Sequence, residues 1–483
     1  MSSAMTTVVT GSAELCAAVL DVGSFRSWDA PAKSPFTADS AYRRELDAAR
    51  CHAGTDEALI TGEGRVDGLR LAVAISEFRF LAGSVGTIAA RRLVDAVERA
   101  TTERLPLLLS PASGGTRMQE GTPAFLEMIA IADRVAAHRR AGLPVIVHLR
   151  HPTTGGAFAS WGSLGTVTTA EPGALIGFLG PKVYRALYGE RFPKDVQTAE
   201  NLHDRGIVDA VVDAEELSGF VRRILSVTSR GPIVTSPATA APDRHSRTSP
   251  DPWTSVTTTR RRDRPGTREL LDQQVHDLVE LTGTGAGETA TATLLCLGCV
   301  GATPCVIVGQ DRSADAAPGP ADLRTARRGF RLARELGLPL ITVIDTAGGE
   351  LSPEAENGAL AGEIARCLAE LIDLPVPSVS VLAGQGSGGV ALSLFAARRR
   401  IAARHAWLAP LPPEGASVIV HGTPDLAADV VRDQRVGSFD LLRIGAVDRI
   451  VDECPDAADE PTAFLARLAV AIEEEVQLHT AQS

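Results

Sequence analysis

The feature that most constrains the fold of this chain is a pattern of elements that occurs twice. Residues 86–115 read GTIAARRLVDAVERATTERLPLLLSPASGG, which predicts a helix, a short turn, an apolar strand and a pair of glycines. Residues 319–349 read GPADLRTARRGFRLARELGLPLITVIDTAGG and predict the same order. A second helix, a second apolar strand and a second glycine-rich turn then follow in each half, TTGG at 153–156 and GQGSGG at 384–389.

The spacing of the glycines supports an internal duplication. Gly114 and Gly155 are 41 residues apart, and Gly348 and Gly388 are 40 apart. Each half also closes with a similar phrase, RGIVDAVVD in the first and IGAVDRIVD in the second. Several matches in one order predict a duplicated unit of about half the chain. Because strands alternate with helices, we expect parallel β–α–β units with right-handed crossovers.

The composition of one segment predicts the boundary between the two halves. Residues 229–267 are rich in Thr, Ser, Pro and Arg and have little apolar periodicity, as is typical of a linker. We therefore predict an N-terminal domain at 1–228, a linker at 229–267 and a C-terminal domain at 268–483.

Composition and charge exclude several classes of protein. The apolar content of 44% supports large cores, but no apolar run is long enough to span a membrane and no secretory leader is visible, so we expect a cytoplasmic protein without a membrane partner. The net charge of −11 argues against nucleic-acid binding. The seven cysteines are scattered, as expected of reduced thiols, and we interpret the CxxC at Cys296 and Cys299 as buried strand residues rather than metal ligands.

The glycine turns predict a chemistry. A glycine pair at the carboxyl end of a buried strand leaves backbone N–H groups free, and the helix that follows adds the positive end of its dipole. Such donors suit an oxyanion that develops during a reaction. The alternative is that each turn only connects a strand to a helix, but four turns in matched positions favour the first interpretation.

Conventional catalytic signatures are missing from the sequence. It contains no GxSxG elbow, no HExxH and no GxxxxGK[ST] loop, and its histidines form no compact metal-ligand cluster. His148 and His151 lie near the TTGG turn, where they are either proton-transfer residues or ordinary polar residues. The pattern alone therefore predicts a duplicated α/β enzyme that uses backbone donors and a carried cofactor.

The two halves resemble different subunits of one known family. The first half is similar to the β subunit of bacterial acetyl-CoA carboxylase carboxyltransferase, in the segments LDVGSFRSWDA, EFRFLAGSVGTIAARR, SPASGGTRMQEG and HPTTGGAFASWGSLGTVTTAEPGALIGFLGP. The second half resembles the α subunit more loosely, in PWTSVTTTRRRDRPGTRELL, FRLARELGLPLITVIDTAGG and GEIARCLAELIDLPVPSVSVLAGQGSGG. The chain therefore looks like a β–α fusion.

The resemblance implies a fold and a reaction. It implies two tandem crotonase (ClpP/crotonase) fold domains, each a β–β–α superhelical spiral, with the active site between a β-type and an α-type half. It also implies transfer of a carboxyl group from N1-carboxybiotin to the α-carbon of an acyl-CoA, giving malonyl-CoA for fatty acid or polyketide synthesis when the acceptor is acetyl-CoA. The released biotin anion would serve as the base, so that no side-chain base is required.

The resemblance also assigns site residues by motif. The amides of Gly114 and Gly115 would hold the thioester oxygen as it becomes an enolate, and a second set would hold the ureido oxygen of biotin, namely Gly388, Gly389 and Val390. The substrate-binding residues would be Gly155, Gly156, Gly348, Gly349 and Arg117. Arg117 would counter the CoA phosphates or, alternatively, be a solvated residue at a helix start.

Three departures from the family pattern affect these expectations. The N-terminus has only Cys16 where the family's β subunits carry a four-cysteine zinc ribbon, so we expect no metal. The GQGSGG turn is one residue shorter than the usual form, and Ala347 stands where the family has proline. No lysine has the Met-Lys-Met context of a biotin attachment site, so biotin carboxyl carrier protein and biotin carboxylase are expected as separate partners.

The leading hypothesis is a carboxyltransferase component acting on acetyl-CoA as a homodimer or hexamer. A biotin-independent decarboxylase of malonyl-thioesters would use the same enolate site. A weakened scaffold paralogue is the third alternative, since the shortened turn and Ala347 could lower activity. The acyl-chain preference, the pathway and the carrier partner are left open by the sequence.

Overall fold

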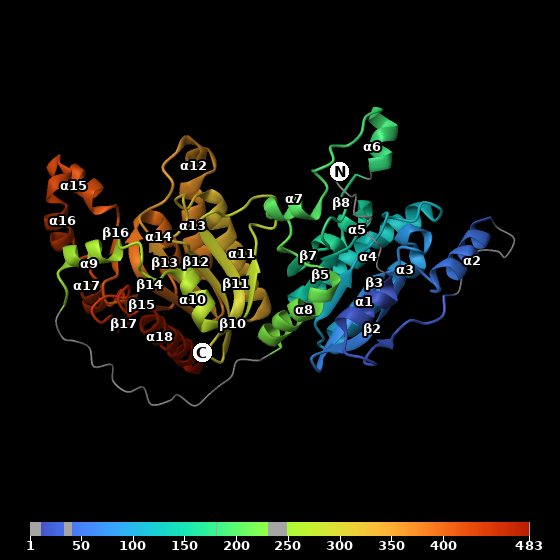
Figure 1. The fold of residues 1–483 in the computed structure, drawn as a ribbon, viewed down its shortest axis with the longest axis horizontal. Coiled ribbons are helices and arrows are strands. Elements are labelled where there is room, and N and C mark those ends of the chain that lie inside the picture. The colour runs from blue at the N-terminus through green and yellow to red at the C-terminus, as the bar shows by residue number, and fades with distance from the viewer. Residues whose placement is uncertain (1–10, 33–40, 180, 230–248, 483) are drawn as a thin grey trace, which may run out of the picture. The chain divides into compact units, whose positions relative to one another are not determined.

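The computed structural model describes residues 11–32, 41–179, 181–229 and 249–482. The chain divides into two compact units, Met1–Leu225 and Ser226–Ser483. Each unit is built around one β-sheet with helices against it (Figure 1). None of the helices in the described ranges is long and apolar enough to cross a membrane.

The sheet of the N-terminal unit has seven strands in the order β1-β2-β3-β4-β5-β7-β9. β1, β2 and β3 pair antiparallel, and the strands from β3 onward pair parallel. A separate parallel pair, β6-β8, lies beside the second glycine turn. The bounds are β1 Arg26–Ser27, β2 Leu59–Val66, β3 Leu69–Ser76, β4 Leu107–Ser110, β5 Val145–Leu149, β6 Thr153–Thr154, β7 Val167–Ala170, β8 Ile176–Gly177 and β9 Ala210–Val211.

Two helices on the N-terminal sheet follow directly from the apolar periodicity of the sequence. In α3 (Thr87–Thr102) the buried positions include Ala89, Ala90, Leu93 and Val97, a three-to-four-residue repeat that faces the sheet. α4 (Gly121–Arg140) contributes Ile131 and Val135 to the same core. The other helices of this unit are α1 Ser12–Val19, α2 Ala41–Ala53, α5 Gly155–Phe158, α6 Pro181–Tyr188, α7 Ala199–Asp204 and α8 Ala214–Thr228.

The C-terminal unit repeats this plan with an eight-stranded sheet, in the order β10-β11-β12-β13-β14-β15-β17 with β16 against β14. β10, β11 and β12 pair antiparallel, and β12 to β17 pair parallel. The strands are β10 Val275–Leu281, β11 Thr293–Val300, β12 Thr303–Gln310, β13 Leu340–Thr346, β14 Ser378–Ser387, β15 Arg399–Ala403, β16 Trp407–Ala409 and β17 Arg449–Val451.

The helices of the C-terminal unit include α11 and α13, the counterparts of α3 and α4. In α11 the residues Leu323, Ala326, Phe330 and Ala333 are buried at helical spacing. The bounds are α9 Pro252–Thr259, α10 Thr267–Gln274, α11 Pro320–Leu336, α12 Pro353–Asn357, α13 Leu360–Ile372, α14 Gly388–Phe395, α15 Pro413–His421, α16 Ala427–Gln434, α17 Ser438–Arg443 and α18 Pro461–Gln482.

The predicted duplication is therefore visible in the strand order of the two units. Both sheets begin with antiparallel strands and continue as four parallel additions in chain order. Cys296 and Cys299 lie on β11 and are buried, as predicted for strand residues, and burial raises the pKa of the Cys296 thiol. The described residues contain no group of three or more His, Cys, Asp or Glu that could hold a metal ion.

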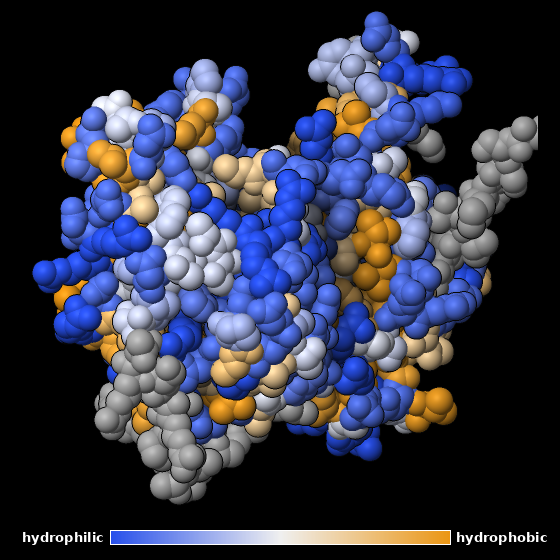
Figure 2. All heavy atoms as spheres, turned by 60° about the vertical axis from the view of Figure 1, so that its left-hand side comes forward, coloured by the Kyte–Doolittle hydropathy of each residue, from blue (hydrophilic) through white to orange (hydrophobic). Residues whose placement is uncertain are grey.

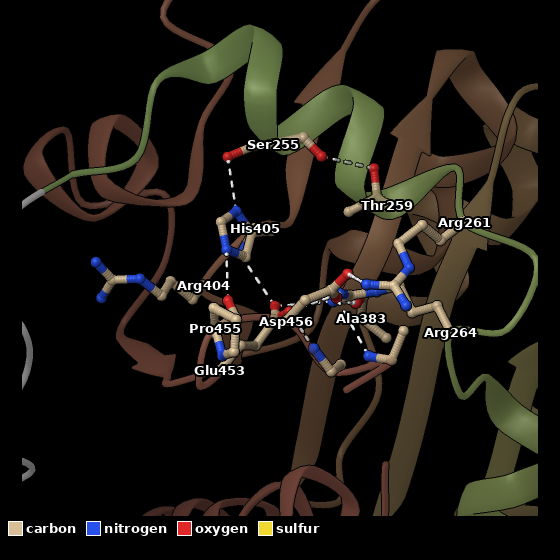
Figure 3. Close-up of polar contacts among 12 residues, drawn as sticks. Ser255, Thr259, Arg261, Arg264, Ala383, Arg404, His405, Glu453, Pro455 and Asp456 are labelled. Atoms are coloured by element: carbon tan, nitrogen blue, oxygen red, sulfur yellow. Dashed lines mark hydrogen bonds and ion pairs between the residues drawn. The ribbon is translucent and has the colours of Figure 1, made fainter. Parts of the chain in front are cut away.

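The predicted linker is too long, because its last part belongs to the C-terminal unit. α9 forms within it, and Arg264 is fully buried in an ion pair with Glu453 (Nη2 to Oε1, 2.8 Å) and Asp456 (Nη1 to Oδ1, 2.6 Å). Arg264 also donates to the carbonyl of Ala383 (Figure 3). Residues 230–248 lie outside the described residues, so only that part of the linker prediction stays open.

Candidate functional site

The first predicted glycine turn follows β4, and both of its amides have partners. The Gly114 N–H donates to the carbonyl of Ala82 (2.9 Å), and the Gly115 N–H donates to Ser113 Oγ (3.0 Å). Gly115 has φ of +109°, a conformation that side chains rarely adopt, which explains a glycine there. The interpretation of Gly114 and Gly115 as free donors is therefore wrong for this conformation.

The second turn of the N-terminal unit lies against the first. A side chain at Gly115 would lie about 3.5–3.6 Å from the backbone of Thr154, Gly155 and Gly156. The Gly155 N–H donates to the carbonyl of Phe178 (3.1 Å). No turn or cap hydrogen bond within the described ranges uses the amide of Gly156. The structure thus brings these glycines together and leaves the Gly156 amide available.

The turn after β13 has the same local geometry. The Gly348 N–H donates to Thr346 Oγ1 (3.2 Å), and Gly348 has φ of +142°. The structural counterpart of Gly348 is therefore Gly115, one residue later than the spacing of the sequence indicates. Gly349 has a packing role, because a side chain there would lie 2.6 Å from a methyl group of Val390.

The start of α14 has amides without a turn or cap partner, at residues where the sequence predicts donors. Gly388, with φ of +72°, is its first residue, and no side chain caps the helix. The turn and cap hydrogen bonds of the described residues include none from Gly388, Gly389 or Val390. The first amides of a helix have no partner inside it, so these three N–H groups remain available beside the positive end of the helix dipole.

A cavity of about 600 Å³ lies at the carboxyl end of β13 in the C-terminal unit. Its walls include the turn residues Thr346, Ala347 and Gly348, together with Gln385 from the end of β14. A volume of this size is typical of a pocket for a small ligand or cofactor. The predicted turn residue Gly348 therefore borders a cavity.

A buried carboxylate fixes one wall of this cavity. Asp345 is paired with Arg312 (Nη1 to Oδ2, 2.6 Å) and accepts a hydrogen bond from the Gln385 N–H (3.0 Å). Burial raises the pKa of Asp345, although Arg312 acts in the opposite direction. Because Asp345 bonds to both β14 and Arg312, it holds the ends of β13 and β14 together.

The structure places Arg117 in the protein interior, not at a phosphate site. The residue is 1% exposed, and its guanidinium pairs with Glu57, bonds to the carbonyl of Ser84 (2.7 Å) and contacts Glu120 (3.3 Å). Both predictions for Arg117, a CoA-phosphate contact and a solvated helix start, are wrong. Its carboxylate partner lies 60 residues earlier, where the sequence gives no signal of the pair.

The two histidines beside the TTGG turn have structural contacts. His148 is buried in β5, and its Nδ1 lies 3.0 Å from Thr169 Oγ1. Burial, and to a lesser extent Arg150, lowers the pKa of His148 to about 3. His151 accepts a hydrogen bond from the Leu175 N–H (3.1 Å). The prediction of a proton-transfer role is not supported for His148, which has no access to a substrate.

The sequence analysis did not single out Ser387, Gln385 or Asp345. The structure places them beside the glycine turns of the C-terminal unit. Ser387 precedes the glycine pair within GQGSGG and could have been found from that motif. Asp345 gave a weaker signal, since an acidic residue at the end of an apolar strand is unusual. The sequence contains no signal for Arg312, because the position of this residue is decided by the loop after β12.

Nearly the whole chain matches a protein family. Residues 14–482 match the family described as the carboxyl transferase domain. A relative from Mycobacterium tuberculosis, "Probable biotin-dependent acyl-coenzyme A carboxylase beta3 subunit", is 56% identical over 463 residues, which are 95% of this chain and 92% of that protein. A relative from Saccharopolyspora erythraea, "Acetyl-coenzyme A carboxylase carboxyl transferase subunits beta/alpha", is 37% identical over 476 residues, 94% of this chain and 83% of that protein.

Solved structures share the fold at low sequence identity. Transcarboxylase 12S, described as a hexamer assembly and solved with hydrolysed methylmalonyl-coenzyme A bound, matches with a TM-score of 0.78 at 19% identity, over 98% of this chain and 89% of that one. A single-chain, multi-domain long-chain acyl-CoA carboxylase matches with a TM-score of 0.75 at 20% identity, over 95% of this chain and 45% of that one.

Proposed function

Because this chain belongs to the carboxyl transferase domain family, we propose that it is the carboxyltransferase component of a biotin-dependent acyl-CoA carboxylase. In this proposal each unit has the crotonase fold, and acetyl-CoA is the acceptor. The resemblance to β/α carboxyltransferase subunits supports acetyl-CoA. The relative with 56% identity is named only as an acyl-CoA carboxylase subunit, so another short acyl-CoA is the alternative acceptor.

One observation carries the proposal: an uncapped helix start with three available amides, at α14. Donors fixed in place before a reaction stabilise developing negative charge without having to reorganise. The glycines keep side chains out of this position, so that a flat, polar ring could approach the backbone. The residues present therefore fit the ureido group of biotin, which offers one oxygen acceptor.

When bound on its carrier protein, biotin supplies the carboxyl group that is transferred. The amides of Gly388, Gly389 and Val390 would hold its ureido oxygen, and the cavity beside Gly348 would accept part of the ring. In the N-terminal unit we assign the thioester oxygen of the acyl-CoA to the Gly156 amide, because Gly114 and Gly115 already have partners. Loss of one such donor costs about 2.7–4 kcal/mol of transition-state stabilisation in comparable sites.

Exposed apolar side chains support the proposal of a homo-oligomer. On the N-terminal unit, Phe125 and Ile129 lie on one side of α4 and are more than half exposed. On the C-terminal unit, Ile419 and Val420 of α15 are similarly exposed. Figure 2 shows apolar patches on one face of an otherwise largely hydrophilic surface. Exposed patches of this kind are typical of interfaces, and we propose a homodimer or hexamer that docks a separate carrier protein.

The reverse reaction provides the test. Purified protein is incubated with malonyl-CoA and biocytin, and acetyl-CoA is measured, with methylmalonyl-CoA and ethylmalonyl-CoA as alternative donors. We expect product to form only when biocytin is present. Product formation without biocytin would favour the decarboxylase instead. No turnover by folded protein, combined with recovery of activity when an active paralogue is added, would favour the scaffold alternative.

A further inference from the structure

Ser387 is a buried polar residue without a partner at the start of α14. It is the last residue of β14 and the N-cap of the helix, and it is 0% exposed. Its hydroxyl has no hydrogen-bond partner within the part of the chain that the structure describes. A buried hydroxyl without a partner costs about 1–3 kcal/mol, so its presence requires an explanation.

A serine at this position ordinarily caps the helix. An N-cap hydroxyl accepts a hydrogen bond from the second or third amide of the helix, which here would be Gly389 or Val390. In α14 the Ser387 side chain makes no such bond. The hydroxyl and the amides are therefore all unsatisfied at one place. A hydroxyl and several amides that lie close together without partners are typical of a site that binds an oxygen acceptor.

The hydroxyl also lies close to the first glycine turn of the same unit. The position that a side chain at Gly348 would occupy lies 3.9 Å from Ser387 Oγ. Gly348 borders the cavity at the end of β13. Gly348 places no side chain beside the buried hydroxyl, and a rotation about χ1 can redirect the O–H toward a ligand.

The duplicated unit provides an internal comparison. Thr154 is the structural counterpart of Ser387. Thr154 follows the residue that is paired with Ser113, and Ser387 follows the residue that is paired with Thr346. Thr154 Oγ1 has a partner, the carbonyl of Ser113 (3.4 Å). The hydroxyl is thus unsatisfied only in the C-terminal unit, where we place biotin.

We propose that Ser387 donates a hydrogen bond to the same ligand oxygen that the α14 amides hold, the carbonyl oxygen of a cyclic urea. This inference rests on the proposed function. A carbonyl oxygen has two lone pairs, and as negative charge grows on it a further donor strengthens the interaction. Ser387 is therefore a specificity-determining residue for the biotin side of the reaction, and it has no part in binding the acyl-CoA.

The test compares Ser387→Ala with Ser380→Ala. Ser380 lies on the same strand and is also buried, but its hydroxyl already donates to the carbonyl of Leu394 (2.6 Å). We expect Ser387→Ala to lower kcat/KM for biocytin about tenfold, the effect of one hydrogen bond to a charged group, and to leave the KM for malonyl-CoA unchanged. The melting temperature should stay the same or rise, because the variant removes a buried hydroxyl that has no partner. Ser380→Ala should lower the melting temperature and leave the KM for biocytin unchanged.

Binding of biocytin, measured by calorimetry without turnover, separates the two hypotheses. If the wild type uses biocytin and Ser387→Ala binds and uses it equally well, the assignment of Ser387 is overturned and the proposed function stands. If the wild type neither binds nor uses biocytin, both are overturned. Weaker binding of biocytin by Ser387→Ala, with a melting temperature no lower than that of the wild type, would support both.

Discussion

At the scale of single residues, the glycines of one turn have different roles. Gly115 is buried and has a positive φ, and a side chain at this position would face the start of α5. Gly114 is exposed, and a side chain there would lie no closer than 3.5 Å to its neighbours. The two glycines look equivalent in the sequence, but only Gly115 has a backbone conformation that requires glycine.

We expect Gly115→Val to reduce kcat/KM in the biocytin assay at least a hundredfold, because it strains the backbone and crowds the amide of Gly156. Gly114→Val should keep most of the activity. Circular dichroism and gel filtration would show whether each variant folds. Equal loss of activity in the two variants would contradict this distinction.

The buried His148 predicts a pH dependence of stability. Its pKa is about 3 in the folded protein, whereas an unfolded histidine has a pKa of about 6.5. Between these values the unfolded state binds the additional proton, so the free energy of unfolding falls as the pH falls below about 6.5, by up to about 1.4 kcal/mol per pH unit, until about pH 3.

His148→Asn retains a polar atom near Thr169 but has no proton to bind. We expect the urea midpoint of the variant to fall less than that of the wild type between pH 7 and pH 5. His138, whose pKa burial lowers to about 4, is present in both proteins, so the difference isolates His148. A steeper acid dependence in the variant would contradict the prediction.

At the scale of elements, ion pairs and hydrogen bonds attach the segment before α10 to the rest of the C-terminal unit. Arg264 bonds to Glu453 and Asp456, and His405 contacts Ser255 of α9 (Nδ1 to Oγ, 3.3 Å) and the carbonyl of Pro455 (Figure 3). Removing one partner of a buried ion pair leaves an uncompensated charge, at a cost of about 3–5 kcal/mol. A polar segment that reads as a linker is therefore part of the fold.

Arg264→Met should lower the melting temperature of the C-terminal unit by several degrees and expose α9 to limited proteolysis. Arg262→Met is the matched control, since that side chain lies two residues away and is exposed. We expect it to have little effect on stability. Equal proteolysis of the two variants would show that the ion pairs do not hold α9 in place.

At the scale of the whole molecule, the resemblance places the active site between a β-type and an α-type half, and in a homo-oligomer the two halves can come from different chains. Gly115→Val inactivates the turn of the N-terminal unit. Gly388→Val should inactivate the turn of the C-terminal unit, because a β-branched residue disfavours the φ of +72° at that position. Each variant alone should be inactive.

Co-expression of the two variants with different tags then tests the arrangement. If centres form between chains, mixed oligomers contain some centres with two intact turns, and roughly a quarter of the wild-type activity should return with random assembly. If every centre forms within one chain, no activity should return. Pull-down on both tags would first establish that mixed oligomers form.

The sequence by itself determined the features that depend on local pattern. Helical periodicity placed α3 and α11, apolar runs placed β4 and β13, and the repeated order predicted two sheets of the same plan. The glycine turns could be located for the same reason, since the need for a side-chain-free backbone is encoded at the residue itself.

Only the tertiary structure decided which polar groups are satisfied. The Gly114 N–H donates to the Ala82 carbonyl, and Arg117 pairs with Glu57. Arg264 pairs with Glu453, which lies 189 residues away in the sequence. Ser387, by contrast, finds no partner within the described residues. Whether a donor is free depends on which distant segments the fold brings beside it, and neither the residue nor its neighbours in the sequence contain that information.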